Sequence, residues 1–280
     1  MNKSNALTGK GEEDIPAWRV AGVSYLNTRP LVYGFRFHPV RKQMVLTEDY
    51  PARIAQQLIH DEVDVGLIPV AIIPELPQAY VISDSCIGAE GPVASVCIFS
   101  DVPITEVKQL YLDYQSRSSV RLARLLLERY WKVEPQLLAA DPGFEQRIQG
   151  HTAAVVIGDR ALDMRGRHAY IYDLAEAWIQ YAGLPFVFAA WIANKPLPDD
   201  FIRAFNEATA MGTRQPHLEQ VIQENHFSAF DVRTYFTKHI SYPLTANKRA
   251  GLMRFLQEIG SSTPVYFHSS PVSASTADGR

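Results

Sequence analysis

Residues 22–30 read Gly-Val-Ser-Tyr-Leu-Asn-Thr-Arg-Pro, and they end an apolar run that begins at Val20. Such a run predicts a buried strand. The turn after it carries two hydroxyls, an amide and a guanidinium, supplied by Ser24, Thr28, Asn27 and Arg29. In open α/β sheets, ligands bind beyond the carboxyl ends of the strands. We therefore predict a ligand site at this turn, with a capped turn between a strand and a helix as the alternative.

The rest of the chain alternates short apolar runs with amphipathic segments, the pattern of βα units around a largely parallel sheet. Strands are predicted at 19–24, 44–47, 63–68, 93–99, 110–112, 153–157 and 185–193. Several are continuous Val, Ile and Leu runs, as expected for strands that are covered on both faces. Helices are predicted to begin at Pro51, after Ser116, at Asp199 and after Thr245, because a proline or a capping residue stands at each start.

Two breaks in the pattern divide the chain into two lobes. Residues 99–103, Phe-Ser-Asp-Val-Pro, end one strand and lead into a new series of elements, which residues 194–198, Asn-Lys-Pro-Leu-Pro, close. The simplest arrangement has one lobe from 17–99 plus 197–265 and an inserted lobe from 100–196. Two crossings of the chain between the lobes are then expected to form a hinge.

Composition and charge exclude several classes of protein. The 280 residues are 47% hydrophobic with a net charge of −3, and no basic run suits a nucleic acid. Neither a membrane span nor a secretory signal is visible, so we expect a cytoplasmic protein. Cys86 and Cys97 are expected to be buried free thiols. The polar ends, 1–16 and 269–280, are predicted to be disordered.

Five further motifs follow the first one along the chain. They are 63–69 (Val-Asp-Val-Gly-Leu-Ile-Pro), 91–96 (Gly-Pro-Val-Ala-Ser-Val), 112–119 (Leu-Asp-Tyr-Gln-Ser-Arg-Ser-Ser), 156–162 (Val-Ile-Gly-Asp-Arg-Ala-Leu) and 173–178 (Asp-Leu-Ala-Glu-Ala-Trp). In this order, the series resembles the chorismate dehydratase family of menaquinone biosynthesis by the futalosine pathway. The resemblance covers about residues 18–260.

This resemblance implies an α/β fold of the two-lobed, periplasmic-binding-protein-like kind (type II), with a ligand cleft between the lobes. It also implies a lyase that dehydrates chorismate to 3-[(1-carboxyvinyl)oxy]benzoate without a metal ion or an organic cofactor. Asn27 and Ser95 match the catalytic polar residues of the family. The serine-rich turn with Ser116, Ser118 and Ser119 matches the loop that contacts the ligand.

The substrate that the resemblance implies carries two carboxylates, which a chain of net charge −3 does not attract as a whole. Local anion sites are needed, and residues 115–119 offer one because they open a helix directly after a strand. Free backbone N–H groups and the helix dipole favour an anion there, and the hydroxyls add donors. The alternative is that Ser116 or Ser118 only caps the helix.

The second carboxylate has two candidate cations, Arg29 and Arg160, and the sequence does not choose between them. Gly158 and Asp159 stand beside Arg160 at the end of a predicted strand. Asp159 is expected either to face the substrate or to cap a short helix over 160–164. Asp173 is expected to cap the helix that contains Trp178, and we leave it out of the predicted site.

The motifs contain no catalytic triad, no paired carboxylates, no metal-binding spacing and no nucleotide-binding loop, so we predict no cofactor and no metal site. Aromatisation of the ring supplies a large driving force, which indicates a substrate-assisted elimination. Asn27 and Ser95 would bond to the departing hydroxyl or orient the enolpyruvyl group, whose carboxylate takes the proton. None of the eight histidines lies in a motif, so we expect them to face solvent or cap helices.

Two other functions remain open. One is a sibling enzyme of the same pathway, 1,4-dihydroxy-6-naphthoate synthase; the match of residues 24–27 and 91–95 to the dehydratase argues against it. The other is a non-catalytic protein that binds a small anion, which the missing export signal disfavours. For the dehydratase we expect a small dianionic substrate, neither nucleic acid nor membrane as a partner, and a monomer or homodimer.

Overall fold

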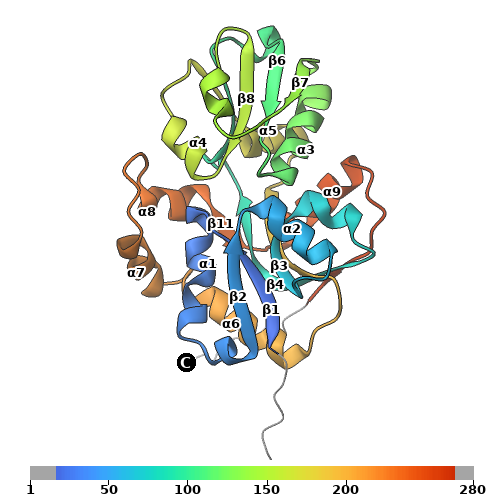
Figure 1. Ribbon diagram of the computed structural model, residues 1–280, viewed down its shortest axis with the longest axis vertical. Helices are drawn as coiled ribbons and strands as arrows, with labels where there is room; N and C mark the ends of the chain where they lie inside the picture. The colour runs from blue at the N-terminus through green and yellow to red at the C-terminus, as the bar shows by residue number, and fades with distance from the viewer. Residues whose placement is uncertain (1–16, 269–280) are drawn as a thin grey trace, which may run out of the picture.

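The computed structural model describes residues 17–268, which form two lobes with one β-sheet each (Figure 1). The disorder expected for 1–16 and 269–280 lies outside the described residues. In Figure 1 the upper lobe carries the sheet with β6, β7 and β8, and the lower lobe carries the sheet with β1 to β4.

The first sheet has seven strands in the order β11-β4-β10-β3-β1-β2, with β12 beside β4. Their bounds are β1 Trp18–Val23, β2 Met44–Asp49, β3 Val65–Pro69, β4 Ala79–Ala89, β10 Phe186–Ala193, β11 Ser241–Pro243 and β12 Val265–Phe267. β1, β2 and β3 are parallel, whereas β10 runs antiparallel to β3 and β4. The sheet is therefore mixed and not largely parallel, because β10 enters it from the other lobe.

The second sheet has five strands in the order β7-β6-β8-β5-β9. Their bounds are β5 Val96–Ser100, β6 Gln109–Leu112, β7 Gln136–Ala139, β8 Thr152–Ile157 and β9 Tyr170–Asp173. β6 is parallel to β7 and β8, and β5 is antiparallel to β8 and β9.

The described helices cover these sheets and begin where the sequence provides a start. In the first lobe they are α1 Arg29–Tyr33, α2 Pro51–Ile59, α6 Asp199–Met211, α7 His217–Glu224, α8 Val232–Thr234 and α9 Ala246–Glu258; α3 Arg117–Leu126, α4 Asp159–Met164 and α5 Leu174–Ala182 follow strands of the second sheet. Pro51 opens α2, and the side chains of Ser116, Asp173 and Thr245 cap α3, α5 and α9. The predicted starts of α2, α3 and α9 are confirmed.

Several short turns connect these elements. The 3₁₀ turns are η1 Leu26–Thr28, η2 Gly34–Arg36, η3 Pro39–Gln43, η4 Val70–Glu75, η5 Ile104–Glu106 and η7 Phe144–Arg147, and the π-helical turns are η6 Leu127–Trp131 and η8 Tyr235–His239. η1 follows β1 and carries Asn27, and η8 precedes β11.

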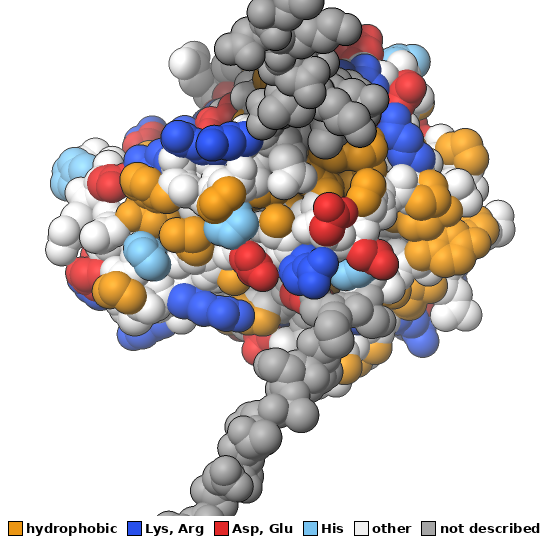
Figure 2. Space-filling view, turned by 90° about the horizontal axis from the view of Figure 1, so that it is seen from below, with side chains coloured by type: hydrophobic (Ala, Val, Ile, Leu, Met, Phe, Trp, Pro, Cys, Tyr) orange, Lys and Arg blue, Asp and Glu red, His pale blue; other side chains and the backbone are white. Residues whose placement is uncertain are grey.

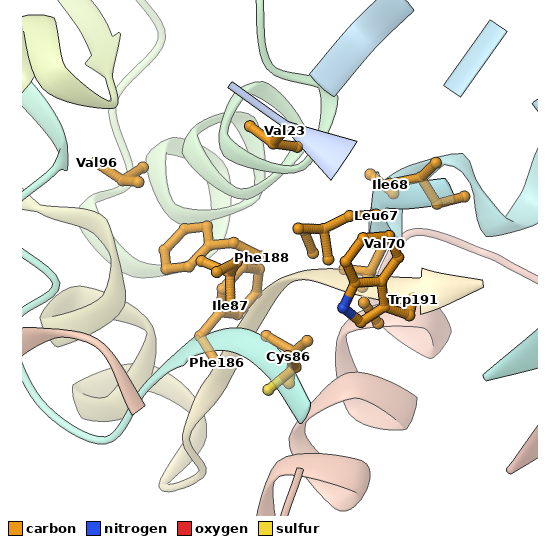
Figure 3. Packing of buried hydrophobic residues seen from close by; sticks show 14 of the residues in the cluster. Val23, Leu67, Ile68, Val70, Cys86, Ile87, Val96, Phe186, Phe188 and Trp191 are labelled. Carbon is orange, nitrogen blue, oxygen red and sulfur yellow. The ribbon is translucent and has the colours of Figure 1, made fainter. Parts of the chain in front are cut away.

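The core of the first lobe is built around β10, whose eight residues are all buried. Figure 3 shows its Phe186, Phe188 and Trp191 among side chains of β3 and β4. The ring centroids of Phe186 and Phe188 are 4.6 Å apart. Burial of each such side chain stabilises the fold by about 1.5–3 kcal/mol, which explains why β10 reads as a continuous apolar run.

All seven predicted strands are present, but sheet membership differs from the predicted lobe boundaries at both crossings. β5, which overlaps the predicted strand 93–99, belongs to the second sheet, and β10 belongs to the first. Breaks in the sequence mark where strands end, whereas the pairing partners decide which sheet a strand joins. We therefore propose that the lobes meet within 90–95 and 174–185, instead of at 99/100 and 196/197.

The long strand β4 has no counterpart among the predicted strands. Ser83, Asp84 and Ser85 interrupt its apolar pattern, and Ser83 and the Asp84 N–H bond to Asn206 on α6. Cys86, also on β4, and Cys97 are buried free cysteines, as expected. On the face that Figure 2 shows, basic, acidic and histidine side chains are intermixed over apolar ones.

Candidate active site between the two lobes

A small cavity lies between the lobes, at the carboxyl ends of strands from both sheets. Val23 ends β1, Pro69 ends β3 and Ile157 ends β8, and all three residues line the cavity. This is the place at which α/β sheets bind ligands. The cavity volume is about 50 Å³, enough for a few water molecules at most. The two lobes are therefore in a closed arrangement.

Six of the ten predicted site residues line this cavity, namely Asn27, Thr28, Ser95, Ser116, Ser119 and Gly158. The other four, Ser24, Arg29, Ser118 and Asp159, do not. The remaining wall is mainly apolar and includes Val93, Val96 and Phe188. The structure thus brings together polar groups that lie up to 131 positions apart, between Asn27 and Gly158.

Asn27 lies in η1 and is 9% exposed. Its backbone carbonyl accepts a hydrogen bond from the Tyr242 hydroxyl at 3.0 Å, and its side-chain Oδ1 accepts one from the Thr28 hydroxyl at 3.2 Å. The amide NH₂ therefore keeps its donors for other partners. The Tyr242 bond holds the backbone of Asn27, and the Thr28 bond orients its side chain at the cavity wall.

Ser95 is fully buried and follows Ala94, whose φ of 64° is in the left-handed region. Its Oγ accepts a hydrogen bond from the Tyr235 hydroxyl at 2.7 Å. Its backbone carbonyl accepts one from the Gly158 N–H at 2.8 Å, which continues the pairing of β5 with β8 in the second sheet. A residue other than glycine with such a φ costs about 1–3 kcal/mol and persists only where its surroundings hold it.

The carboxylate of Asp173 stabilises the backbone of the turn before Ser95. It accepts hydrogen bonds from the Val93 N–H at 3.1 Å and the Ala94 N–H at 2.7 Å, besides the first N–H groups of α5. Burial raises the pKa of Asp173, and these four N–H groups oppose the shift. The predicted capping role is confirmed. The sequence showed no sign that the same carboxylate also shapes the turn before Ser95.

The serines of the serine-rich turn have two different roles. The Ser116 hydroxyl accepts from the Ser119 N–H at 3.1 Å and donates to the Ser119 hydroxyl at 2.8 Å, so both line the cavity at the start of α3. Ser118 points elsewhere, because its hydroxyl accepts from the Ala71 N–H of η4 at 3.1 Å. It joins the lobes and does not line the cavity.

Neither candidate cation reaches the cavity. Arg29 pairs with Glu48 at 3.1 Å and donates to the carbonyl of Ser24, a residue that is itself exposed. Arg160 pairs with the buried carboxylate of Asp113 at 2.7 Å and with Glu145 at 2.5 Å. Both guanidiniums are therefore committed to carboxylates of the protein in this closed arrangement.

Asp159 is the first residue of α4 and joins the lobes instead of lining the cavity. Its carboxylate accepts from the Leu26 N–H in η1 at 3.2 Å. Burial raises the pKa of Asp159, while the Leu26 N–H and the nearby Arg29 oppose the shift. The side chain makes no cap bond within α4, and Gly158 occupies the capping position.

Gly158 has a φ of +65°, which only glycine adopts without strain. A Cβ built there would lie 3.1 Å from the ring of Tyr25. The Tyr25 hydroxyl donates to Oε1 of Gln115, so Tyr25 reaches from the first lobe onto the second. Tyr25 lines the cavity and was not among the predicted residues, although it lies inside the first motif.

The site uses two further tyrosines, Tyr235 and Tyr242, that stand in no motif. Both are buried, and burial raises the pKa of each well above its usual range. Each phenol therefore stays protonated and acts as a hydrogen-bond donor. The run 235–242 offers no local sign of this role, because its partners Asn27 and Ser95 are far away in the sequence.

The cavity wall within residues 17–268 contains no charged side chain and no histidine. Two helices, α2 with Pro51 and α3 with Ser119, begin at this wall. Backbone N–H groups at a helix start attract anions, and the effect is stronger where water is excluded. The cavity thus offers neutral donors and helix starts to a ligand, and the wall itself holds no general base.

Two kinds of feature are absent from the residues that the structure describes. No helix within 17–268 is long and apolar enough to cross a membrane. Over the same range, no three His, Cys, Asp or Glu side chains are grouped so that they would hold a metal ion. Of the histidines, His38 accepts from the Val40 N–H at the start of η3, and the ring Nδ1 of His239 lies 2.8 Å from the Pro92 carbonyl oxygen.

Comparison with known proteins connects this site to a family. A family model described as menaquinone biosynthesis matches residues 18–260. The chorismate dehydratase of Thermus thermophilus is 25% identical over 266 residues, which are 84% of this chain and 93% of that protein. The chorismate dehydratase of Campylobacter jejuni is 24% identical over 163 residues, 57% of this chain and 73% of that protein.

Solved structures share the fold. A protein from Archaeoglobus fulgidus superposes with a TM-score of 0.68 at 13% identity, covering 86% of this chain and 96% of that one. The periplasmic aliphatic sulphonate binding protein of Escherichia coli gives 0.55 at 14% identity, with 91% and 95% covered. At these identities the similarity shows the fold alone, which is the periplasmic-binding-protein-like fold that the sequence motifs implied.

Proposed function

This chain belongs to the menaquinone biosynthesis family, and on that premise we propose that it is a chorismate dehydratase. The proposed reaction converts chorismate to 3-[(1-carboxyvinyl)oxy]benzoate and water, so the protein would be a carbon–oxygen lyase. The relatives that carry the name chorismate dehydratase are 24% and 25% identical to it. At this low sequence identity, the geometry of the site is the main support for the same reaction.

One observation supports the proposal above the others. Asn27 and Ser95, the two residues that match the family's catalytic positions, line the same cavity and are 9% and 0% exposed. They come from different parts of the chain, and the cavity around them is otherwise apolar or hydroxyl-lined. A buried amide and a buried hydroxyl that face one cavity are suited to binding a polar substrate.

The electrostatics of the cavity fit a dianionic ring. The starts of α2 and α3 supply positive potential, and the Ser119 hydroxyl supplies a donor at the start of α3, since the Ser116 proton is already bonded to Ser119. We propose that one carboxylate of chorismate binds at the start of α3. Arg29 and Arg160 stay candidates for the other only if the lobes open and their ion pairs exchange.

The proposed mechanism is a substrate-assisted elimination. One ring C–H bond and the adjacent C–OH bond break, and the electron pair of the C–H bond becomes a ring double bond. The enolpyruvyl carboxylate takes the ring proton, and the hydroxyl that departs leaves as water once that proton reaches it. No oxidation state changes, so the reaction needs no redox cofactor. Asn27 and Ser95 would stabilise the departing hydroxyl through hydrogen bonds.

Orientation and exclusion of water would supply most of the acceleration. The closed lobes hold the reacting groups in one geometry, which converts binding energy into rate. Aromatisation makes the elimination favourable overall. This division of work explains why the cavity wall needs no strong base.

The direct test is to mix the purified protein with chorismate and follow products by mass spectrometry and near-ultraviolet absorbance. The proposal predicts loss of one water and the appearance of an aromatic product. Recovery of unchanged chorismate from a folded protein that binds it would support the anion-binding alternative. Turnover of the substrate of 1,4-dihydroxy-6-naphthoate synthase, without turnover of chorismate, would support the sibling enzyme.

The cytoplasmic location and the monomeric or homodimeric state expected from the sequence also stay predictions. Sedimentation of the purified chain, with and without chorismate, would determine the oligomeric state.

A further inference from the structure

The phenol of Tyr235 bonds to Ser95 but does not line the cavity, and it has no role in the mechanism proposed above. Tyr235 is the first residue of η8, a π-helical turn, and its side chain is fully buried. Turns of this type occur often at functional sites. The same turn ends at His239, whose ring Nδ1 meets the carbonyl of Pro92 at 2.8 Å. η8 therefore contacts the turn that carries Ser95 at two points.

The hydrogen bond between this phenol and Ser95 has a defined direction. The phenol donates to the Ser95 Oγ at 2.7 Å. The Asn27 side chain lies near enough to the phenol to oppose the rise of its pKa that burial causes.

A serine hydroxyl has one proton. Since Ser95 Oγ already accepts from Tyr235, the proton of Ser95 is free to bond elsewhere, and Ser95 lines the cavity. Burial keeps the pKa of Tyr235 far above neutral, so the phenol does not lose its proton to the substrate. It acts on the reaction only through the groups that it orients.

We propose that Tyr235 is a positioning residue that aims the Ser95 hydroxyl into the cavity as a donor. The inference rests on the proposed function, because it assigns Ser95 the departing hydroxyl as its partner. A hydroxyl that accepts a hydrogen bond is polarised by it. The hydroxyl then donates its own proton more strongly to a developing negative charge. The phenol therefore strengthens an interaction that matters most in the transition state.

A merely structural role for the phenol makes a different prediction. In that case, loss of the hydroxyl would lower stability and would change substrate binding and turnover only as far as the fold is disturbed. A positioning role lowers kcat with little change in KM, because the affected interaction forms with the departing group. The two roles are therefore separable by kinetics.

The experiment compares Tyr235→Phe, Ser95→Ala, the double variant and a control, Tyr33→Phe, in the chorismate assay. Tyr33 is also a buried tyrosine, and its hydroxyl donates to Gln220, away from the cavity. We expect Tyr235→Phe to lower kcat by about 10- to 100-fold, below the loss for removing a direct donor. KM should change by less than about threefold, and Tyr33→Phe should keep the rate of the unchanged protein.

The double variant provides the decisive comparison. If Tyr235 acts through Ser95, adding Tyr235→Phe to Ser95→Ala lowers kcat no further. Thermal melting gives a second readout that needs no turnover. The double variant should melt no lower than Ser95→Ala alone, because removal of both partners leaves no buried group unpaired.

The outcomes separate the inference from the proposed function. If the unchanged protein does not convert chorismate, the proposed function fails and the inference with it. If it converts chorismate and Tyr235→Phe stays within twofold of it, the inference alone is overturned. Additive losses of kcat in the double variant, or an equal loss in Tyr33→Phe, also overturn the inference.

Discussion

The amide of Asn27 shows how much of this site depends on single side chains. Its orientation is set by Thr28 on the same turn, and the backbone of Asn27 is held by Tyr242, which is 215 positions away. Ser95 is set in the same way by Tyr235, 140 positions away. A buried polar group that lost such partners would cost about 1–3 kcal/mol, so the pairs are expected to act on stability as well as on chemistry.

Replacement of Asn27 tests the proposed role of the amide. We expect Asn27→Ala to lower kcat by about 100-fold or more, the loss typical of removing a donor to a developing negative charge. The matched control is Asn225→Ala, since Asn225 bonds to the Val221 carbonyl and lies outside the cavity. Kinetics near those of the unchanged protein for a folded Asn27→Ala would remove Asn27 from the mechanism.

Gly158 gives a second prediction at this scale. In Gly158→Ala, the positive φ is strained by about 1–3 kcal/mol, and the new methyl group pushes on the Tyr25 ring at the cavity wall, which has to shift slightly. We expect lower stability and a kcat/KM reduced by about 10- to 100-fold, because small displacements of a site are costly.

Gly166→Ala separates strain from displacement. Gly166 also has a positive φ, of 83°, but a Cβ there meets no atom within 4 Å. It should lose stability in thermal melting and keep its activity. Equal losses of kcat/KM in the two variants would show that the contact with Tyr25 is irrelevant.

At the scale of elements, turns and strand ends are held by buried carboxylates. Asp173 fixes the turn before β5, and Asp64 fixes the start of β1 in the first sheet. Asp64 accepts from the backbone N–H of Arg19 at 2.8 Å and pairs with the Arg19 guanidinium at 2.9 Å and with the Lys195 ammonium at 2.6 Å. One carboxylate thus joins the chain near β1, β3 and β10.

The pKa of Asp64 gives this contact a defined pH dependence. Burial alone would raise the pKa, but hydrogen bonds from Arg19 and Lys195 outweigh it and hold the pKa far below its usual value. Because the folded pKa is lowered, the stabilisation is present above the unfolded pKa, about 4, and is lost as the pH falls below it.

Asp64→Asn should therefore lower the free energy of unfolding at pH 7 by about 1–3 kcal/mol. The difference from the unchanged protein should shrink as the pH falls below about 4. Urea unfolding at several pH values measures this, with Asp61→Asn as a control, since the Asp61 side chain is 63% exposed and should matter less. A difference that stays constant down to acid pH would contradict the role of the charge.

For the whole molecule, the main question is how a substrate enters a cavity of about 50 Å³. Pockets for small molecules are typically about 300–1,000 Å³. The lobes must therefore separate, and the polar contacts that break include Tyr25 with Gln115, the Leu26 N–H with Asp159 and the Ala71 N–H with Ser118. Opening also has to break apolar contacts, since α3 of the second lobe packs against η4 of the first in one hydrophobic cluster.

Small-angle X-ray scattering tests this opening. We expect a smaller radius of gyration with saturating 3-[(1-carboxyvinyl)oxy]benzoate than without it, because the bound product favours the closed lobes. A salt of matched ionic strength serves as the control. Unchanged scattering, under conditions in which calorimetry shows binding, would mean that the ligand enters without separation of the lobes.

Much of the local structure follows from the sequence. Proline and hydroxyl caps predict the starts of α2, α3 and α9, and apolar runs predict β1, β3 and β8. The first motif places Asn27 beyond the end of a strand, where the structure has it. These features depend on a few neighbouring residues, so a single stretch contains all the information they need.

Other features depend on contacts between distant parts of the chain. The sheet that β5 or β10 joins, the bond between Tyr235 and Ser95, and the turn of Ser118 toward Ala71 all need partners that no local pattern specifies. The sequence alone therefore determined the strands with continuous apolar runs, the caps and the polar residues at the strand ends, but not the interrupted strand β4. Only the tertiary structure decided which of these residues share the cavity, because long-range packing sets the direction of each side chain.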